Sequence, residues 1–378
     1  MISCGEPSGD LYAGALATEI LRAAPGTTIS GLGGDCLRDA GATLVEHFGG
    51  ISVTGLLEVA RVLPKTYATY RRLVQHAAAE RPDVFVAIDF PDFNFRLARA
   101  VRKLGIPVVY YISPQLWAWR PGRMKTMRAI ADRVLVIFEF EKAIYEQAGV
   151  PVDWVGHPLL DVMVPPEPAG ALLQRVGLDP SHPVVALLPG SRRNELREIL
   201  PGLVEAARLI RTAVPDVQFV VARAPHLSDD LFAPLAALGP VGIVDGQADQ
   251  VLAAADLAIV ASGTVTVQAA LHECPMIVVY RLSPLTYRLG RRFVRVDTFA
   301  MANLVAGRRV VPELIQNDFT PDAVANHAIA LLRDPVRRDG MRRDLQAVRA
   351  ALGPPGASAR AAGIVLNVGA RAAMSRPT

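Results

Sequence analysis

Cysteine, aromatic residues and long hydrophobic runs are all scarce in this sequence of 378 residues. The three cysteines, Cys4, Cys36 and Cys274, lie far apart, which argues against a disulfide framework and against the spacing of a structural zinc site. Aromatic residues make up only 6% of the chain, so the core must be built mainly from Ala, Val, Leu and Ile. No apolar run approaches the roughly 18 to 20 residues that span a bilayer, and no signal-peptide pattern opens the chain. These absences predict a soluble cytoplasmic protein.

Several common catalytic and nucleotide-binding motifs are missing as well. The stretch GLGGD at 31–35 is not G-x-G-x-x-G, because Cys36 occupies the place of the third glycine. The chain contains no G-x-x-x-x-G-K-[ST], no H-E-x-x-H and no G-x-S-x-G, and its seven histidines are scattered. No catalytic metal site is therefore expected. A formal charge of +4 does not by itself indicate a nucleic-acid partner, although residues 120–128 and 287–296 are locally basic.

Short β-branched runs alternate with helical stretches along most of the chain. Residues 84–89, 108–113 and 133–138 are strand-like, and the pattern restarts after a proline-rich segment at 164–170. Continuous apolar strands between helices predict parallel sheets that are covered on both faces. We expect an α/β protein with two Rossmann-like, doubly wound parallel-sheet domains that face each other across a cleft. The expected bounds are 1–163, 164–345, and 346–378 for a helical tail that packs back on the first domain.

The candidate site motifs all stand where a predicted strand ends. In open parallel sheets, ligands bind outside the carboxyl ends of the strands. The placement of all five motifs at strand ends is therefore stronger evidence for a functional site than any single motif. The motifs are GEPSGD (5–10), IDFPDFN (88–94), ISPQLWAW (112–119), LPGSRRNE (188–195) and ASGTVT (261–266).

LPGSRRNE has the features of an anion-binding turn. Gly190 interrupts the strand, and Ser191 is expected to cap the helix that follows. Backbone N–H groups at a helix N-terminus suit an anion, and Arg192 adds donors that fit phosphate oxygens. The alternative is an ordinary capped turn with solvated arginines.

ASGTVT repeats the theme with Ser262, Gly263 and Thr264, whose small side chains let a ligand approach the backbone and whose hydroxyls can cap a helix or bind phosphate. By itself this turn is better explained as ordinary structure. Two such turns in one half of the chain favour a nucleotide whose diphosphate is held by two helix N-termini.

IDFPDFN places a carboxylate at a strand end. Asp89 is the last strand residue, next to apolar Phe90 and Pro91, which favours a raised proton affinity and a role as general base. The alternative is that an aspartate of the motif caps the next helix, and we assign that structural role to Asp92.

Two further segments suit a lipid substrate or surface. ISPQLWAWRPGRMK includes Trp117 and Arg120 and is interpreted either as a sugar- or lipid-facing lip with a phosphate-binding rim or as aromatic packing of a loop. Residues 52–73 combine helical apolar spacing with basic residues, so they form either plain core or a surface that meets lipid.

Together these motifs, with SVTGLLEV, VGHPLLD and NLVAGRRVVPELIQ, occur in an order that resembles the lipid-A-disaccharide synthase family over about residues 3 to 350. The resemblance implies the GT-B fold and an inverting glycosyltransferase of lipid A biosynthesis. Such an enzyme joins UDP-2,3-diacylglucosamine to 2,3-diacylglucosamine 1-phosphate (lipid X) and releases UDP. The first domain then serves the lipid acceptor, and the second binds the UDP-sugar.

The resemblance also assigns residue roles. Asp89 matches the family's essential aspartate, and Arg192 with its turn would stabilise the leaving UDP without a metal ion. Asn303 and Arg308 match the family's NLxAGR motif, and Asn303 is expected to reach the donor side of the cleft. Gln268 stands where GT-B enzymes often place a glutamate on the nucleotide ribose, so a charge-assisted bond is replaced by an amide contact.

GEPSGD is then expected to reach the cleft from the end of the first strand. Gly5 keeps the backbone close to a ligand, Glu6 touches a substrate, and Ser8 and Asp10 cap a helix that begins at Leu11. Only four residues precede this motif, whereas members of the family usually have a fuller first strand, so the native chain is expected to have residues before its first methionine.

No cofactor, metal or nucleic-acid partner is expected. The resemblance implies peripheral attachment to the cytoplasmic face of the inner membrane, and a homodimer is an option because some relatives are dimers. One alternative is another GT-B enzyme that acts on a sugar nucleotide, such as a non-lipid glycosyltransferase or a UDP-sugar epimerase. The other is a catalytically inactive scaffold or membrane protein that keeps the fold.

Overall fold

The computed structural model describes residues 1–49, 56–119, 121–224, 227–282 and 298–374. These residues form two compact units. The first unit holds residues 1–162 together with the segment that starts at Leu352, and the second holds the described residues between Met163 and Ala351.

The first unit is built on a seven-stranded sheet in the order β3-β2-β1-β4-β5-β6-β7, and all of its neighbouring strands run parallel. The strands are β1 (Ile2–Ser3), β2 (Ser30–Gly33), β3 (Thr43–His47), β4 (Phe85–Ile88), β5 (Val108–Tyr111), β6 (Arg133–Val136) and β7 (Val152–Trp154). The helices are α1 (Pro7–Ala23), α2 (Asp35–Asp39), α3 (Leu56–Glu80), α4 (Pro91–Lys103), α5 (Leu116–Trp119), α6 (Met124–Ile130), α7 (Glu139–Gln147), α8 (Leu159–Val162) and α17 (Ala357–Met374), with a 3-10 turn at Pro121–Arg123.

The second unit has a six-stranded parallel sheet in the order β10-β9-β8-β11-β12-β13. Its strands are β8 (Val184–Leu188), β9 (Gln218–Arg223), β10 (Gly242–Asp245), β11 (Leu257–Ala261), β12 (Met276–Tyr280) and β13 (Glu313–Ile315). Its helices are α9 (Ala169–Arg175), α10 (Arg193–Ala213), α11 (Ala248–Ala254), α12 (Val265–Leu271), α14 (Met301–Ala306), α15 (Pro321–Arg333) and α16 (Pro335–Ala351), with 3-10 segments at Asp229–Leu238 and Gln316–Asp318.

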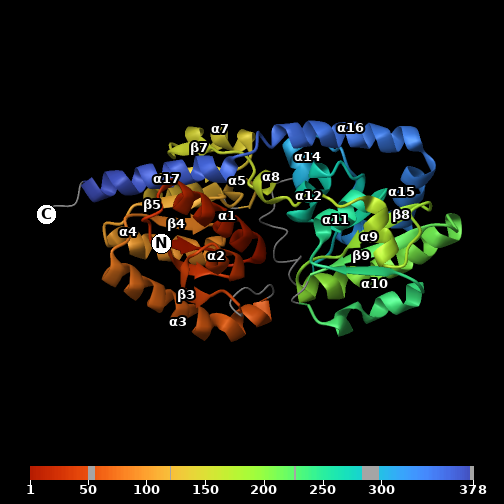
Figure 1. Ribbon diagram of the computed structural model, residues 1–378, viewed down its shortest axis with the longest axis horizontal. Helices are drawn as coiled ribbons and strands as arrows, with labels where there is room; N and C mark the ends of the chain where they lie inside the picture. Colours follow the sequence, from red (N-terminus) through yellow and green to blue (C-terminus); the bar gives the residue numbers. More distant parts are fainter. Residues whose placement is uncertain (50–55, 120, 225–226, 283–297, 375–378) are drawn as a thin grey trace. The chain divides into compact units, whose positions relative to one another are not determined.

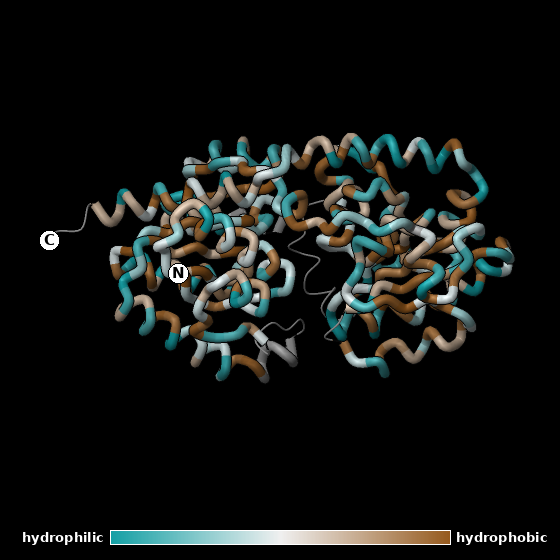
Figure 2. Tube along the Cα trace, viewed as in Figure 1, coloured by the Kyte–Doolittle hydropathy of each residue, from teal (hydrophilic) through white to brown (hydrophobic). Residues whose placement is uncertain are grey.

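Continuous apolar sequence explains the burial of the central strands. Every residue of β4 (FVAI), β5 (VVYY), β8 (VVALL) and β11 (LAIVA) is buried. Helices must therefore cover both faces of each sheet, since a strand with one solvated face would alternate apolar and polar residues. Figure 2 shows hydrophobic segments gathered inside each unit and hydrophilic ones on the outer helices.

The end of the chain packs on the first unit. Helix α17 lies against α1 (Figure 1). The carboxylate of Asp161 in α8 accepts hydrogen bonds from the backbone N–H groups of Gly356 (2.6 Å) and Ser358 (2.7 Å). The Arg360 guanidinium donates to the Val155 carbonyl at 2.9 Å. Residues 346–351 instead complete α16 in the second unit.

Each sheet reverses its strand order at one point, between β1 and β4 in the first unit and between β8 and β11 in the second. The carboxyl ends of strands at such a switch point form a crevice because their connections leave toward opposite faces. GEPSGD and Asp89 follow β1 and β4, whereas LPGSRRNE and ASGT follow β8 and β11. Four of the five strand-end motifs thus stand at the two switch points, as the predicted doubly wound fold requires.

Candidate functional site

Asp89 directly follows β4 in an unusual backbone conformation. Asp89 (φ 42°) and Phe90 (φ 49°) both adopt left-handed dihedral angles, which side chains of L-residues disfavour. The Asp89 carbonyl accepts hydrogen bonds from Asn94 Nδ2 at 2.8 Å and from the Tyr110 hydroxyl at 2.9 Å. Its N–H donates to the Tyr111 carbonyl at 3.2 Å. These bonds hold the backbone of the candidate base in a strained position at the sheet edge.

Asn94 is the residue that connects the two strands of this switch point. Its side chain is fully buried, and its Nδ2 also donates to the carbonyls of Ser3 and Ile88, both at 3.1 Å. Its Oδ1 accepts from the Ser3 hydroxyl at 2.7 Å. One amide therefore links the end of β1 to the end of β4 and to Asp89. The motif alone gives Asn94 no role, because its partner Ser3 lies 91 positions earlier in the chain.

The helix-capping role predicted for Asp92 is wrong. Helix α4 begins at Pro91 with Phe90 as its N-cap. Proline has the backbone dihedral of a helix already fixed and lacks an N–H that would need a partner, so the helix starts two residues earlier than a cap at Asp92 would place it. Asp92 lies in the first turn, largely exposed, and pairs with Arg123 Nη2 at 2.8 Å.

A similar shift corrects the prediction for GEPSGD. Helix α1 begins at Pro7 rather than Leu11, with Glu6 as N-cap and no side-chain capping bond. Ser8 therefore lies in the first turn, half-buried. Gly5 is buried, and a Cβ at this position would overlap the Phe90 ring, which confirms that the backbone after β1 closely approaches the turn after β4.

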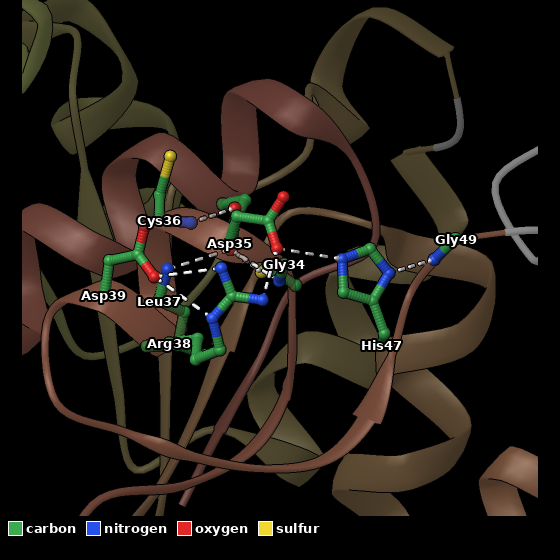
Figure 3. A network of polar contacts seen from close by, with 10 residues as sticks. Gly34, Asp35, Cys36, Leu37, Arg38, Asp39, His47 and Gly49 are labelled. Carbon is green, nitrogen blue, oxygen red and sulfur yellow. Dashed lines mark hydrogen bonds and ion pairs between the residues drawn. The ribbon is translucent and has the colours of Figure 1, made fainter. Parts of the chain in front are cut away.

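Asp10 caps a helix, but a different one from the helix predicted. Its buried carboxylate accepts hydrogen bonds from the N–H groups of Gly34 (2.7 Å), Cys36 (2.9 Å) and Leu37 (3.2 Å) at the start of α2. Figure 3 shows this end of α2, where Arg38 also bonds to its neighbour Asp39. The last residue of the motif thus docks α2 onto α1 and has a structural role.

The turn after β8 binds an anion that belongs to the chain itself. Helix α10 begins at Arg193 with Arg192, not Ser191, as its N-cap. The Glu195 carboxylate accepts from the backbone N–H groups of Ser191 (3.0 Å) and Arg192 (3.3 Å) and from Arg192 Nη1 (3.0 Å). The capping role predicted for Ser191 is therefore wrong, because Glu195 reaches back as the second half of a capping box. Gly190 adopts φ 124°, and a Cβ there would lie 2.5 Å from Glu195 Oε2.

The turn after β11 is more open. Gly263 and Thr264 are exposed, and a Cβ on Gly263 would meet no atom within 4 Å. Thr264 is the N-cap of α12 but makes no capping bond with its side chain. The Ser262 hydroxyl donates to the Phe299 carbonyl at 3.2 Å, and this bond ties the turn to the segment before α14. One turn into the helix, Gln268 is half-buried and donates from Nε2 to Asp249 Oδ1 at 3.3 Å.

The aromatic segment after β5 rests on a buried acid. Trp117 donates from its indole N–H to Glu141 Oε1 at 3.2 Å, and its ring meets Phe140 edge-on at 5.3 Å. Glu141 is 1% exposed, and its other carboxylate oxygen has no hydrogen-bond partner. Burial raises the pKa of Glu141 to about 7, partly offset by the Trp117 bond. Arg120, predicted for the rim of this segment, lies outside the described residues.

The structure gives Asn303 a structural role and so corrects its predicted position on the donor side. The Asn303 amide is 1% exposed and fully bonded. It donates to the Val311 carbonyl (2.9 Å) and to Glu313 Oε1 (2.7 Å), and it accepts from the N–H groups of Val310 (2.7 Å) and Val311 (2.9 Å). No donor or acceptor of this amide remains for a substrate. Arg308 is mostly exposed and pairs with Asp344 of α16, with Nη2 2.5 Å from Oδ1.

The predicted site residues that follow β1, β4, β8 and β11 therefore form two groups, one at each switch point. Gly5, Glu6 and Asp89 gather at the ends of β1 and β4, whereas Gly190, Arg192, Gly263 and Gln268 gather at the ends of β8 and β11. Within the described ranges, no three His, Cys, Asp or Glu residues are arranged to hold a metal ion. None of the helices in these same ranges combines the length and hydrophobicity needed to cross a membrane.

A model of the lipid-A-disaccharide synthetase family matches residues 1–366. The chain belongs to this family. The lipid-A-disaccharide synthase of Geobacter sulfurreducens is 42% identical over 373 residues, which cover 97% of this chain and 96% of the relative. The synthase of Anaeromyxobacter dehalogenans strain 2CP-1 is 44% identical over 371 residues, with 97% of each chain covered.

Solved structures of a more distant epimerase and a more distant glycosyltransferase share the fold of this synthase family member. A UDP-GlcNAc 2-epimerase from Neisseria meningitidis, bound to UDP-GlcNAc, aligns with a TM-score of 0.64 at 14% identity and covers 97% of this chain and 98% of its own. The calicheamicin glycosyltransferase CalG4 aligns with a TM-score of 0.60 at 17% identity, with 98% and 97% covered. These likenesses, together with the two parallel sheets, establish the predicted GT-B fold.

Proposed function

We propose that the protein joins UDP-2,3-diacylglucosamine to 2,3-diacylglucosamine 1-phosphate, forming the β-1,6-linked disaccharide 1-phosphate and UDP with inversion at the anomeric carbon. Membership of the lipid-A-disaccharide synthase family supports the substrates. The observation in the structure that supports the reaction most directly is Asp89, held in a strained backbone conformation at the first switch point. Strain of this kind is characteristic of functional sites.

Inversion requires a single displacement, and the proposed base for it is Asp89. Its carboxylate takes the proton of the acceptor 6-hydroxyl while that oxygen forms a bond to the anomeric carbon. The bond from the anomeric carbon to the UDP oxygen breaks, and the electron pair leaves with UDP. A positioned base contributes roughly 10²- to 10⁴-fold to such a step, or about 3–5 kcal/mol of barrier. Asn94 and Tyr110 act through the Asp89 carbonyl and serve as positioning residues.

The donor is proposed to bind the second unit at the β8–β11 switch point. Two N–H groups of the Ser191–Arg192 turn already bind the Glu195 carboxylate, which supports an affinity of this turn for anionic oxygen. Arg192 supplies a guanidinium beside it, and the open space above Gly263 admits a ligand to the backbone. These donors would stabilise the negative charge that develops on UDP. Activity is expected to persist in EDTA.

The test uses Asp89→Asn with Asp92→Asn as its matched control, because both aspartates belong to the same turn and Asp92 is mostly exposed. The full chain is incubated with UDP-diacylglucosamine and lipid X, and the disaccharide and UDP are quantified by mass spectrometry. Asp89→Asn should reduce turnover by at least about 10²-fold while UDP binding by calorimetry is kept, and Asp92→Asn should remain near wild type. Normal turnover by Asp89→Asn would remove Asp89 from the mechanism.

Peripheral membrane association is a further part of the proposal, and α3 is its candidate surface. Leu63 and Tyr67 are four residues apart on this helix, and 53% and 63% of their surfaces are exposed. Arg71 continues the same stripe and is exposed as well. Apolar side chains beside cations suit the interface of a bilayer that contains anionic lipids. On the opposite side of α3, Leu73 and Ala77 are fully buried, so only one face is free for lipid. Residues 52–55 of the segment predicted for this role lie outside the described residues.

Flotation with liposomes that contain anionic lipid tests this surface at low salt. The double variant Leu63→Asp/Tyr67→Asp should lose most of the bound fraction. Val336→Asp on α16 is the control, because Val336 is an even more exposed apolar residue, 78% exposed, in the second unit. Equal binding by both variants would exclude α3 as the membrane surface.

A further inference from the structure

A polar cluster in the second unit joins α11 to α12 beside the proposed donor site. Asp249 on α11 places Oδ1 3.3 Å from Gln268 Nε2 and 3.0 Å from His272 Nε2 on α12. Gln268 and His272 are four residues apart, so both side chains lie on the same face of α12, toward α11. The side chain of His272 is 5% exposed and that of Asp249 is 20% exposed. The cluster is thus largely closed to water.

The chemistry of the aspartate determines how the Gln268 amide is turned. An ionised carboxylate can only accept hydrogen bonds, so Gln268 must direct its NH₂ group toward Asp249. The carbonyl oxygen Oε1 then lies on the other side of the amide, away from Asp249. Without this partner, the two orientations of a half-buried amide would differ little in free energy. His272 Nε2 lies 3.0 Å from the same oxygen, Asp249 Oδ1, and so helps to keep the carboxylate in place beside Gln268.

Gln268 lies close to the two turns that are proposed to bind the phosphates of the donor. Gln268 lies one turn beyond the open Ser262–Gly263–Thr264 turn that ends β11. Strand β11 pairs with β8, whose end bears the anion-binding turn with Arg192. A nucleotide whose phosphates lie at these turns has its ribose hydroxyls within the same crevice. Hydroxyl groups are donors, and an amide oxygen turned toward them accepts their hydrogen bonds.

We propose that Asp249, supported by His272, is a positioning residue that presents Gln268 Oε1 as an acceptor for the ribose hydroxyls of the donor nucleotide. A glutamate at position 268 would place its own carboxylate against the ligand. Here the carboxylate belongs to Asp249 on α11 and acts on the ligand through Gln268. This inference rests on the proposed function, because it assumes that the second unit binds a uridine nucleotide.

Calorimetry on the full chain with UDP and with 2′,3′-dideoxy-UDP tests the proposal. Asp249→Ala should weaken UDP binding about tenfold, the equivalent of one well-made hydrogen bond, and should change binding of the dideoxy nucleotide less than about twofold. Asp216→Ala is the matched control, because Asp216 is an exposed aspartate just before β9, at the amino ends of the strands and so away from the carboxyl ends where the donor is proposed to bind. Equal weakening of both nucleotides by Asp249→Ala, or no weakening of either, would overturn the proposal.

A charge exchange provides the second test and does not depend on the stability of the alanine variant. Gln268→Glu alone places two carboxylates about one hydrogen-bond length apart and should weaken UDP binding. Adding Asp249→Asn gives the new glutamate a neutral partner and should restore affinity to within about threefold of wild type. Failure of the double variant to recover, when its melting temperature is normal, would refute the positioning role alone. Failure of the wild-type chain to bind UDP would refute the proposed function together with this inference.

Discussion

The hydrogen bonds to the Asp89 carbonyl make a prediction that separates catalysis from stability. Tyr110→Phe removes only the hydroxyl that donates to this carbonyl at 2.9 Å. Burial and the nearby Asp89 raise the pKa of the Tyr110 phenol, so the wild-type group stays protonated and donates at neutral pH. Ser3→Ala is the matched control, because it also removes one buried hydroxyl of the same network but leaves both donors to Asp89 in place.

The expected magnitudes follow from these bonds. Each variant loses one buried hydrogen bond, so each should lower the free energy of unfolding of the first unit by about 1 kcal/mol. Asn94→Ala loses four contacts, three of which share the two N–H groups of Nδ2, so about 3 kcal/mol is expected by the same scale. The left-handed backbone at Asp89 is strained by about 1–3 kcal/mol, so a lost donor lets the turn relax and moves the carboxylate. A misplacement of this kind should reduce the kcat of Tyr110→Phe about tenfold.

The assay combines urea unfolding with steady-state kinetics of disaccharide formation. Tyr110→Phe and Ser3→Ala should unfold at similar urea concentrations, but only Tyr110→Phe should have a reduced kcat, with the KM for the UDP-sugar unchanged. If kcat falls equally in both variants, or in neither, the Asp89 carbonyl is not what positions the base and this reasoning is refuted.

Two further predictions concern stability and the donor turn. The raised pKa of Glu141, about 7 against an ordinary 4.5, means that its contribution to stability is complete below about pH 4.5 and is lost as the pH rises through 7. Thermal unfolding of Glu141→Gln should lack this decline, which amounts to about 3 kcal/mol; parallel pH curves for both proteins would contradict it. Gly190→Ala should raise the Kd for UDP about tenfold or more, because φ 124° strains any other residue and its Cβ would meet Glu195. Gly177→Ala, strained at φ 75° but with nothing within 4 Å, should leave the Kd unchanged, and equal effects in calorimetry would show that strain alone is responsible.

The sequence was sufficient to predict the doubly wound fold because the information is local. Apolar runs such as VVALL and LAIVA are too short and too uniform for surface helices, and each one ends in a turn. Once these runs are assigned to parallel strands, their carboxyl ends must share an edge. That reasoning predicts that all five motifs lie at strand ends and that LPGSRRNE and ASGT share a ligand, whereas the neighbourhood of Asp89 and the GEPSGD turn follows from the strand order of the structure.

The errors arose where a side chain bonds far along the chain or where local rules compete. Asp10 caps α2, whose N–H groups lie 24 to 27 positions away, and no local pattern reveals that partner. Asn303 was expected to reach the donor because it matches the family's NLxAGR motif. Its bonds to Val310 and Val311 depend on how the segment before β13 folds back, which no local pattern reveals. The helix starts were predictable in principle. Pro7 and Pro91 each fit the first position of a helix better than its interior, whereas Glu195 lies four residues after Ser191, one more than the spacing of a capping box.

The N–H groups of the proposed donor turn are occupied by Glu195, an anion that is covalently part of the chain. A tethered group competes with free ligands at an effective concentration in the millimolar range or above. Inorganic phosphate or a lone pyrophosphate has to displace this carboxylate with few contacts to compensate, whereas a uridine nucleotide brings its ribose and base to the same crevice. In the proposed donor site, this carboxylate therefore disfavours the abundant small anions of a cell, and selectivity for the nucleotide would depend on Glu195 as well as on the groups that bind the ligand.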